Sequence, residues 1–199
     1  MIAAERDIRL KSAITCRSRT AGFGQLPGAG STTIRRMAID KNTFWGSNHY
    51  EHPPLTDETL GRAEGALGVR LPTELIELLR IQNGGYTEGF ALPMSRATSW
   101  ASDHIPLDEL NGIVLDPTVK TALNLMDTAY MTAEWDLPPQ QVLLAGAGHY
   151  WITLDYRNGP APSVAWIDID SGEDFQVADS FAAFLSNLVP ASVYEPPEE

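Results

Sequence analysis

The stretch from residue 142 to residue 178 is the part of the sequence that most constrains the fold. Within it, residues 149–156 alternate, with Tyr150, Ile152 and Leu154 on one face, and this period of two is typical of a β-strand. Further strand-type runs occupy residues 142–145, 164–169 and 175–178, separated by turn-forming residues at 146–148, 157–160 and 170–172. Consecutive strands joined by tight turns predict an antiparallel β-meander.

Amphipathic segments predict helices on both sides of this meander. The first runs over residues 56–67, with Thr56 as its N-cap and Gly68 as its terminator. A second helix follows over residues 73–82 and ends at the turn-forming residues 83–85. The remaining predicted elements are helices over 117–135 and 180–188 and short strand-type runs over 90–94 and 105–110. The expected fold class is therefore α+β, with an antiparallel β-meander sheet packed against several helices.

Charge is divided unequally along the chain. Residues 1–36 contain seven basic and two acidic residues, a net charge of +5, whereas residues 37–199 contain seven basic and 24 acidic residues, a net charge of −17. A domain this acidic repels phosphate backbones and anionic lipids, so we expect no direct binding to nucleic acid or to membranes. The excess of carboxylates either keeps the protein soluble or attracts a basic partner, and composition alone leaves both explanations open.

The basic first segment also differs from the rest in its sequence pattern. Residues 1–36 are rich in Ser, Thr and Gly and lack sustained periodicity, so we expect a disordered N-terminal extension. A true start at Met37 is an alternative explanation of the same stretch. Residues 37–54 are expected to be a linker that leads into a folded domain of residues 55–190. Residues 191–199 are expected to be an acidic, frayed tail.

Three motifs, taken in order, resemble a known family. They are Leu67-Gly68-x-x-Leu71-Pro72 followed by Asn83-Gly84-Gly85, then Gly146-x-Gly148-His149-Tyr150-Trp151-Ile152-x-Leu154-Asp155-Tyr156-Arg157 followed by Pro162-x-Val164, and finally Ala178-Asp179-Ser180-Phe181-x-x-Phe184-Leu185. Each motif is weak alone, but their order over residues 55–190 resembles the SMI1/KNR4 (SUKH) family. The resemblance implies an α+β fold in which a small antiparallel sheet packs against helices.

The resemblance also implies a class of function. Bacterial members of the family are largely similar to immunity proteins, which bind and neutralise toxins, often nucleases, that are delivered between competing cells. Fungal members look like regulatory scaffolds with long disordered arms. This chain lacks such long arms, which favours the bacterial type. The matched positions are mostly fold positions, so the resemblance assigns no functional residue.

Motifs for cofactor or metal binding are incomplete. The glycines between residues 22 and 32 lack the Lys that precedes Ser or Thr in a phosphate-binding loop. His49 and His52 have no evident third ligand, and we interpret them as solvated loop histidines. Asp168 and Asp170 begin a pattern similar to a calcium loop, but the Glu of its twelfth position is missing, which favours a hairpin turn. We therefore expect no cofactor and no metal ion.

No catalytic constellation stands out. His149 and Asp155 lack the Gly-x-Ser-x-Gly elbow of a hydrolase, and carboxylate pairs are easy to draw in a chain with 26 acidic residues. We therefore expect a protein that is not an enzyme. The single cysteine, Cys16, excludes an intramolecular disulfide and fits a cytoplasmic location. Since no apolar run approaches about 18 residues, we expect no membrane-spanning segment.

Surface residues around the predicted sheet form the candidate partner-binding site. Eight acidic residues flank the strands and would steer a basic partner if they share a face. Trp151 lies on the face opposite Tyr150, where it is either a core residue or an exposed interface anchor. The candidate residues are Asp103, Asp108, Glu109, Trp151, Asp155, Asp168, Asp170, Glu173 and Asp174.

The leading functional hypothesis is an immunity-type protein that binds and occludes a basic toxin domain of the nuclease type. The ordered motifs and the net charge of −17 over residues 37–199 support it. A regulatory or adaptor module of the same family, without a toxin partner, is the alternative. A hydrolase would require a pocket of convergent polar groups, which the sequence does not indicate.

Overall fold

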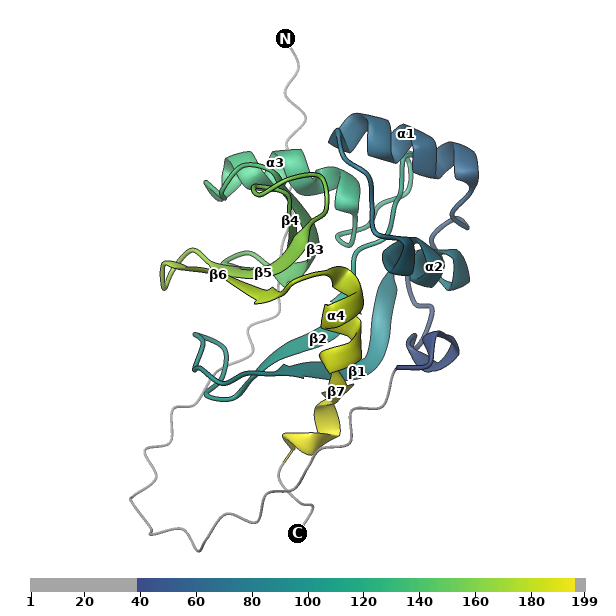
Figure 1. Ribbon diagram of the computed structural model, residues 1–199. Coiled ribbons are helices and arrows are strands. Elements are labelled where there is room, and N and C mark those ends of the chain that lie inside the picture. Colours follow the sequence, from purple (N-terminus) through teal and green to yellow (C-terminus); the bar gives the residue numbers. More distant parts are fainter. Residues whose placement is uncertain (1–38, 196–199) are drawn as a thin grey trace, which may run out of the picture. The chain divides into compact units, whose positions relative to one another are not determined.

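A computed structural model describes residues 39–195 of the chain (Figure 1). Its helices and strands within this range are α1 (Asp57–Leu67), α2 (Thr73–Ile81), β1 (Gly85–Pro93), β2 (His104–Leu110), α3 (Thr128–Glu134), β3 (Gln141–Ala147), β4 (Tyr150–Asp155), β5 (Ser163–Asp168), β6 (Glu173–Ala178), α4 (Phe181–Asn187) and β7 (Val189–Pro190). Short 3-10 helices cover Lys41–Thr43, Leu125–Asp127 and Ala191–Val193. The expectations for residues 1–36 and for the end of the tail, residues 196–199, lie outside the described residues.

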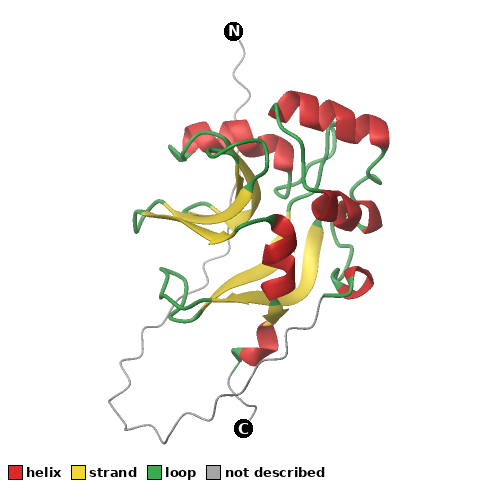
Figure 2. Ribbon diagram, in the orientation of Figure 1, coloured by secondary structure: helices red, strands yellow, loops and turns green. Residues whose placement is uncertain are grey.

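The strands form two antiparallel sheets, drawn in yellow in Figure 2. One sheet has four strands in the order β3-β4-β5-β6, which is the meander that the alternating sequence predicts. The other has three strands in the order β2-β1-β7, so that the short last strand pairs with β1. The predicted α+β class with an antiparallel meander is confirmed, whereas the second sheet was not predicted as a separate unit.

Local signals in the sequence set the ends of the helices. The hydroxyl of Thr56 accepts a hydrogen bond from the backbone N–H of Thr59 at 3.1 Å, as expected of an N-cap. Gly68 ends α1 in the left-handed conformation, with φ of 72°, and its N–H donates to the carbonyl of Glu64 at 2.9 Å. Ser180 caps α4 in the same way as Thr56 caps α1. The first, second and last predicted helices are therefore present at the expected positions.

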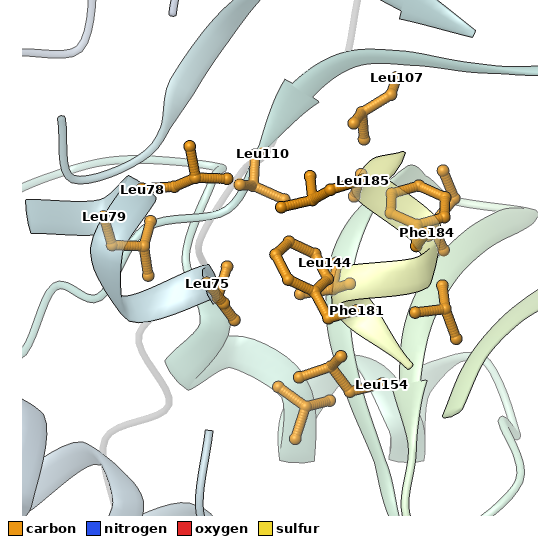
Figure 3. Packing of buried hydrophobic residues seen from close by; sticks show 14 of the residues in the cluster. Leu75, Leu78, Leu79, Leu107, Leu110, Leu144, Leu154, Phe181, Phe184 and Leu185 are labelled. Atoms are coloured by element: carbon orange, nitrogen blue, oxygen red, sulfur yellow. The ribbon is translucent and has the colours of Figure 1, made fainter. Parts of the chain in front are cut away.

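One hydrophobic core joins α1, α2 and α4 to both sheets (Figure 3). Helix α2 contributes Leu75, Leu78 and Leu79, and α4 contributes Phe181 and Phe184 from the opposite side. The labelled leucines of β2, β3 and β4 fill the space between these helices. Each fully buried side chain of this size stabilises the fold by about 1.5–3 kcal/mol relative to exposure to water.

The four-stranded sheet is buried on both of its faces. Ile152 and Leu154 of β4 belong to the main core, as does Trp166 of β5. Trp151 and Ile167 point to the other face, where a second cluster contains Leu137, Leu143 and, at its edge, Met131 of α3. The alternation predicted for residues 149–156 is thus confirmed, because its two sets of side chains enter two different clusters.

The helix predicted over residues 117–135 is wrong for most of its length. Only Thr128–Glu134 is α-helical, preceded by the 3-10 turn Leu125–Asp127. The segment before it is bound to Gly112, whose N–H donates to the carbonyl of Leu123 at 3.1 Å and whose carbonyl accepts from the N–H of Leu125 at 2.8 Å. These tertiary backbone bonds replace the bonds that a helix would make, and apolar periodicity does not reveal them.

The segments at the two ends of the described range are more ordered than expected. The described part of the expected linker, residues 39–54, is not only a linker, since Phe44 and Trp45 are buried and the indole of Trp45 donates to the carbonyl of Leu78 at 3.0 Å. The tail is not frayed in its described part, because the ring of Tyr194 stacks on His104 at 4.0 Å between centres. Within residues 39–195, no helix combines the length and the apolar character needed to cross a bilayer.

Candidate functional site

Two of the candidate acidic residues are neutralised by one arginine. Asp155 on β4 is buried and accepts hydrogen bonds from Arg157 Nε and Gln141 Nε2, both at 2.9 Å. Asp174 on β6 accepts from Arg157 Nη1 at 2.6 Å. Burial acts to raise the pKa of Asp155, but the hydrogen bonds outweigh it and hold this pKa below its ordinary value. Both carboxylates therefore serve the fold and present little free charge to a partner.

Two further candidates, Asp168 and Glu173, attach a loop to the sheet. Asp168 is only 1% exposed and accepts hydrogen bonds from the hydroxyl of Ser99 and from the N–H of Ser171. Glu173 accepts from the N–H of Ser99 at 3.1 Å and from the indole N–H of Trp166 at 2.8 Å. Ser99 lies in the loop of residues 94–103 that joins β1 to β2. These two carboxylates thus hold the loop of one sheet against the end of the other sheet.

Aromatic contacts reinforce this attachment. The guanidinium carbon of Arg96 lies 3.8 Å from the ring centre of Phe175, which is the geometry of a cation–π contact. The ring centres of Trp100 and Tyr150 are 5.2 Å apart, and Tyr150 stacks on Trp166 at the same distance. The loop therefore fixes Trp100, which is 44% exposed, at the surface beside the start of β4.

Trp151 is a core residue and not an exposed anchor. Its side chain is 4% exposed and packs in the second cluster with Leu143 and Ile167. Its indole N–H makes no hydrogen bond within the described part of the chain. The sequence left two interpretations of Trp151 open, and the structure supports a role in core packing. Trp151 is therefore no longer a candidate for contact with a partner.

Two of the remaining candidates stand apart at turns. Asp103 is exposed, with its carboxylate 2.9 Å from Nδ1 of the adjacent His104. Asp170 is exposed in the turn between β5 and β6, which is the hairpin turn favoured over a calcium loop. Among residues 39–195, no group of three His, Cys, Asp or Glu side chains is arranged to hold a metal ion.

Asp108 and Glu109 are adjacent on β2, and neither carboxylate makes a hydrogen bond or ion pair with a residue in the range 39–195. Burial raises the pKa of Asp108, with a smaller opposing effect from His104. Burial also raises the pKa of Glu109, and the charge of Asp108 adds to the rise. Although Asp108 reaches solvent, the surrounding protein removes part of its hydration. These two carboxylates are therefore partly dehydrated without having gained a partner.

Tyrosine rings lie beside Glu109. It is the cross-strand partner of Tyr86 on β1, which is 39% exposed. The ring of Tyr50 lies 5.5 Å from that of Tyr86. Burial raises the pKa of Tyr50, and its hydrogen bond with Tyr86 and the negative charge of Glu109 raise it further. The carboxylate therefore lies within electrostatic reach of both rings.

Tyr150 and Trp100 form a second pair of rings. Burial raises the pKa of Tyr150, and the charges of Asp108 and Glu109 add to this effect. Trp100 is in contact with Tyr150, as described above. These contacts form two groups, Glu109 with Tyr86 and Tyr50 near one end of the β1–β2 pair, and Trp100 with Tyr150 beside the loop at the other end. We refer to Tyr50, Tyr86 and Glu109 as the acidic–aromatic face.

Sequence reasoning found only the carboxylate of this face, Glu109. The rings were missed because Tyr50 lies in the segment interpreted as a linker and Tyr86 in a strand whose first half was not predicted. Residues 85–88 alternate between small or β-branched residues and larger polar ones, which is typical of a strand. This alternation could have extended the strand predicted over residues 90–94 back to Gly85. The contact of Trp100 with Tyr150 depends on the attachment of the loop to the second sheet, for which the sequence has no local signal.

The two histidines considered as metal ligands have different positions. His52 is buried, contrary to the expectation of a solvated residue. Its Nδ1 lies 2.7 Å from the carbonyl of Asn83, and its Nε2 lies 2.8 Å from the hydroxyl of Thr121. It therefore joins the lead-in segment to two later parts of the chain. His49 is exposed, with its ring near Tyr50.

The structure also contains an open groove of about 710 Å³ between α1 and the turn after β4. Its charged groups are bound to one another, since Glu64 pairs with Arg70 at 2.6 Å and Arg157 pairs with Asp155 and Asp174. The hydroxyl of Tyr156 donates to the carbonyl of Arg70 at 2.6 Å. The charged groups of the groove and the hydroxyl of Tyr156 are therefore engaged in holding the fold.

The charge of the described residues remains strongly negative after internal pairing. Residues 39–195 contain 22 acidic and seven basic residues. Four of the basic residues form ion pairs with carboxylates of the same unit, and Arg96 lies on Phe175. Most carboxylates are thus left without a basic partner at the surface of this range.

Comparison with known families decides the classification. The model of the SMI1 / KNR4 family (SUKH-1) matches residues 54–187. The chain belongs to the SMI1/KNR4 family. The match begins just before α1 of this SMI1/KNR4 domain and ends with α4, so it includes both strands that bear the acidic–aromatic face. Compared with proteins of curated function, the chain matches none.

Proposed function

We propose that the protein binds another protein, a basic toxin domain of the nuclease type, and neutralises it as an immunity protein does. The observation that carries the proposal is the charge of residues 39–195, with 22 acidic and seven basic residues. Membership of the SMI1/KNR4 family supports a role in protein–protein interaction. A nuclease domain fits as partner because proteins that bind nucleic acid are basic.

The proposed mechanism is steric and electrostatic. Unpaired carboxylates attract a basic partner over about one Debye length, roughly 8–10 Å at physiological salt, and raise the association rate. After docking, the protein covers the surface with which the toxin would bind nucleic acid. No bond is made or broken in this mechanism, and it would operate in the cytoplasm, where a nuclease finds its substrate.

Binding is a better-supported proposal than catalysis. The buried carboxylates Asp155 and Asp168 are held by hydrogen bonds that keep them ionised, and the pKa of each lies below its ordinary value. A general acid at neutral pH requires the opposite shift. Asp108 and Glu109, whose pKa values are raised, lie on the edge strand β2, and Tyr86 on the neighbouring strand is exposed. An exposed edge of this kind suits contact with a large partner.

Affinity capture from the source cells tests this proposal. The full chain serves as bait, and bound proteins are eluted along a salt gradient because a charge-driven complex weakens as salt rises. We expect a basic, toxin-like domain to be released at moderate salt in near-equal amount to the bait. Salt-insensitive capture of a housekeeping complex would contradict the proposal and favour a regulatory or adaptor module.

A further inference from the structure

We propose that the partner adds an extended basic segment as a further strand to the free edge of β6. This inference rests on the proposed function for the basic character of the partner. It adds the place of contact and the form of the segment that is recognised. Strand β6 lies at the outer edge of the four-stranded sheet (Figure 1), since the strand order is β3-β4-β5-β6.

The register of the meander identifies the side to which each residue of β6 turns its backbone groups. The N–H of Ile169 donates to the carbonyl of His149 at 2.8 Å, so hydrogen-bonded and non-bonded pairs alternate along β4 and β5 from this point. In this alternation Trp166 turns its N–H and carbonyl away from β4 and towards β6. Its partner on β6 is Phe175, which therefore bonds inward, to β5.

Asp174 and Gln176, the two neighbours of Phe175, turn their N–H and carbonyl groups to the outer side of β6. On that side neither backbone has a partner within residues 39–195. Both residues are exposed. The edge therefore offers an N–H and a carbonyl at each of two residues spaced two apart, which is the spacing at which an added strand forms its bonds.

Side-chain contacts hold this edge in position. Arg157 bonds both to Asp155 of β4 and to Asp174 of β6, so it ties the outer strand to the interior of the sheet across β5. On the other face, the ring of Phe175 packs against the main core and lies under the guanidinium of Arg96. A strand that is already fixed loses little conformational entropy when a partner binds to it.

The charge around β6 favours a basic occupant. Residues 168–179, which contain β6 and the turns at its two ends, include five acidic and no basic residues. Asp170 and Asp179 are exposed beyond opposite ends of the strand, and neither forms an ion pair within the described part of the chain. A segment with basic residues is therefore attracted to the whole length of this edge.

The two faces of β6 determine how the side chains of the segment alternate. Phe175 and Val177 are partly buried against the main core on one face, whereas the exposed Asp174 and Gln176 lie on the other. Side chains of an added strand lie beside those of β6 on the same two faces. A segment in which basic and apolar residues alternate fits both of them.

Other occupants fit this edge less well. A second copy of the chain, paired through its own β6, would bring two sets of carboxylates together, and like charges on opposite strands are destabilising. An acidic segment would be repelled for the same reason. A docked helix would leave the outward N–H and carbonyl groups of β6 without partners, because its own backbone groups are bonded internally.

Hydrogen exchange of single amides, followed by NMR on the full chain, tests the proposal directly. The probe is a capped peptide, about as long as β6, that alternates arginine and valine. We expect the amides of Asp174 and Gln176 to exchange at least about tenfold more slowly with the peptide than without it. The amide of Phe175, bonded within the sheet, is the internal control and should be protected in both states. Absence of binding, or binding without new protection at these two amides, would overturn the proposal.

Matched peptides separate strand addition from general attraction by charge. The same arginine–valine peptide with N-methylated backbone amides keeps its charge but cannot donate to β6, and it should bind at least about tenfold more weakly. Equal binding of the two peptides would show that only charge matters and would overturn strand addition. Protection of the same two amides that grows with protein concentration in the absence of peptide would identify a second copy as the occupant, and would also overturn the proposal.

A backbone variant tests the edge from the side of the protein. Gln176→Pro removes an outward N–H that the sheet does not use, at a position where an edge strand tolerates proline. Gln176→Ala is the matched control, since it loses the side chain and keeps the N–H. We expect about fivefold weaker binding of the peptide to Gln176→Pro and less than about a twofold change for Gln176→Ala. Equal binding to both folded variants would overturn the assignment of this edge, and the exchange experiment on the unchanged chain decides if Gln176→Pro does not fold.

The same variants distinguish this inference from the proposed function. If Gln176→Pro still captures the basic toxin domain as well as the unchanged chain does, strand addition at β6 is wrong while the proposed function stands. If no basic domain is captured but the peptide protects Asp174 and Gln176, the proposed function fails and strand addition stands.

Discussion

Glu109 and Tyr86 are directly opposite each other on adjacent antiparallel strands, and the carboxylate has no basic partner within the described residues. Together with Asp108, it forms a pair of neighbouring negative charges whose pKa values burial raises. The free protein therefore contains an arrangement that opposes folding at neutral pH. Such arrangements are expected where a partner supplies the missing interaction.

The first prediction concerns the stability of the free protein. A pKa that is raised in the folded state means that the unfolded state is ionised more readily, so these carboxylates destabilise the fold once the pH exceeds their unfolded pKa values. Asp108→Asn/Glu109→Gln should therefore increase the free energy of unfolding at pH 7. Urea unfolding at pH 7 and near pH 4 measures the effect, and the gain should shrink at the lower pH. Destabilisation at pH 7 would contradict the account.

The second prediction has the opposite sign and concerns Asp155. Its pKa is lowered in the folded state, so its contribution to stability is present above the unfolded pKa and is lost as the pH falls through the folded pKa. Arg157→Ala should cost about 2 kcal/mol at pH 7, because it leaves a buried carboxylate without its cation. The cost should decrease in acid. Arg62→Ala, at an exposed position of α1, is the control and should change stability by less than about 0.5 kcal/mol.

The third prediction uses the glycines of α1. Gly61 and Gly65 lie in the helix, and an added Cβ would meet no atom within 4 Å at either position. Replacement of each by Ala should stabilise the protein by about 0.5–1 kcal/mol, since glycine loses more backbone entropy on helix formation. Gly68→Ala is the matched control and should destabilise the protein, because Gly68 has φ of 72°. The melting temperatures of the three variants measure these effects. Destabilisation by both Gly61→Ala and Gly65→Ala would contradict the free space described at these two positions of α1.

The fourth prediction concerns the loop that carries Trp100. Ser99→Ala removes the hydroxyl that donates to the buried Asp168, and should cost about 1–3 kcal/mol of local stability. Hydrogen exchange should become faster in residues 94–103 and remain unchanged in α2. Unchanged exchange in the loop would show that this attachment is not what orders it.

Much of the fold could be predicted because the relevant signals are local. Thr56 and Gly68 define the ends of α1 through contacts within a few residues, and the alternation around Ile152 requires only the period of a strand. The helix predicted over residues 117–135 failed because Gly112 binds this segment from a distance in sequence. Periodicity therefore predicts an element well only where no tertiary backbone bond competes.

The candidate site could be predicted only in part, for a related reason. The sequence identifies carboxylates, but whether each one is free depends on non-local partners. Asp174 pairs with an arginine 17 residues away, and Asp168 accepts a hydrogen bond from a serine 69 residues away. The pairing of Tyr86 with Glu109 depends on the register of β1 and β2. This register shifts between Tyr86 and Phe90, and no sequence pattern predicts the shift.

The most direct test of the central claim is the nucleic-acid-cleaving activity of the captured basic domain, measured while the full chain is added in increasing amounts. The account predicts that activity falls to the background level at about one equivalent of the chain and returns as salt is raised, because the complex depends on charge. A captured domain that remains fully active with excess chain would contradict neutralisation. The acidic surface would then serve a binding role without inhibition.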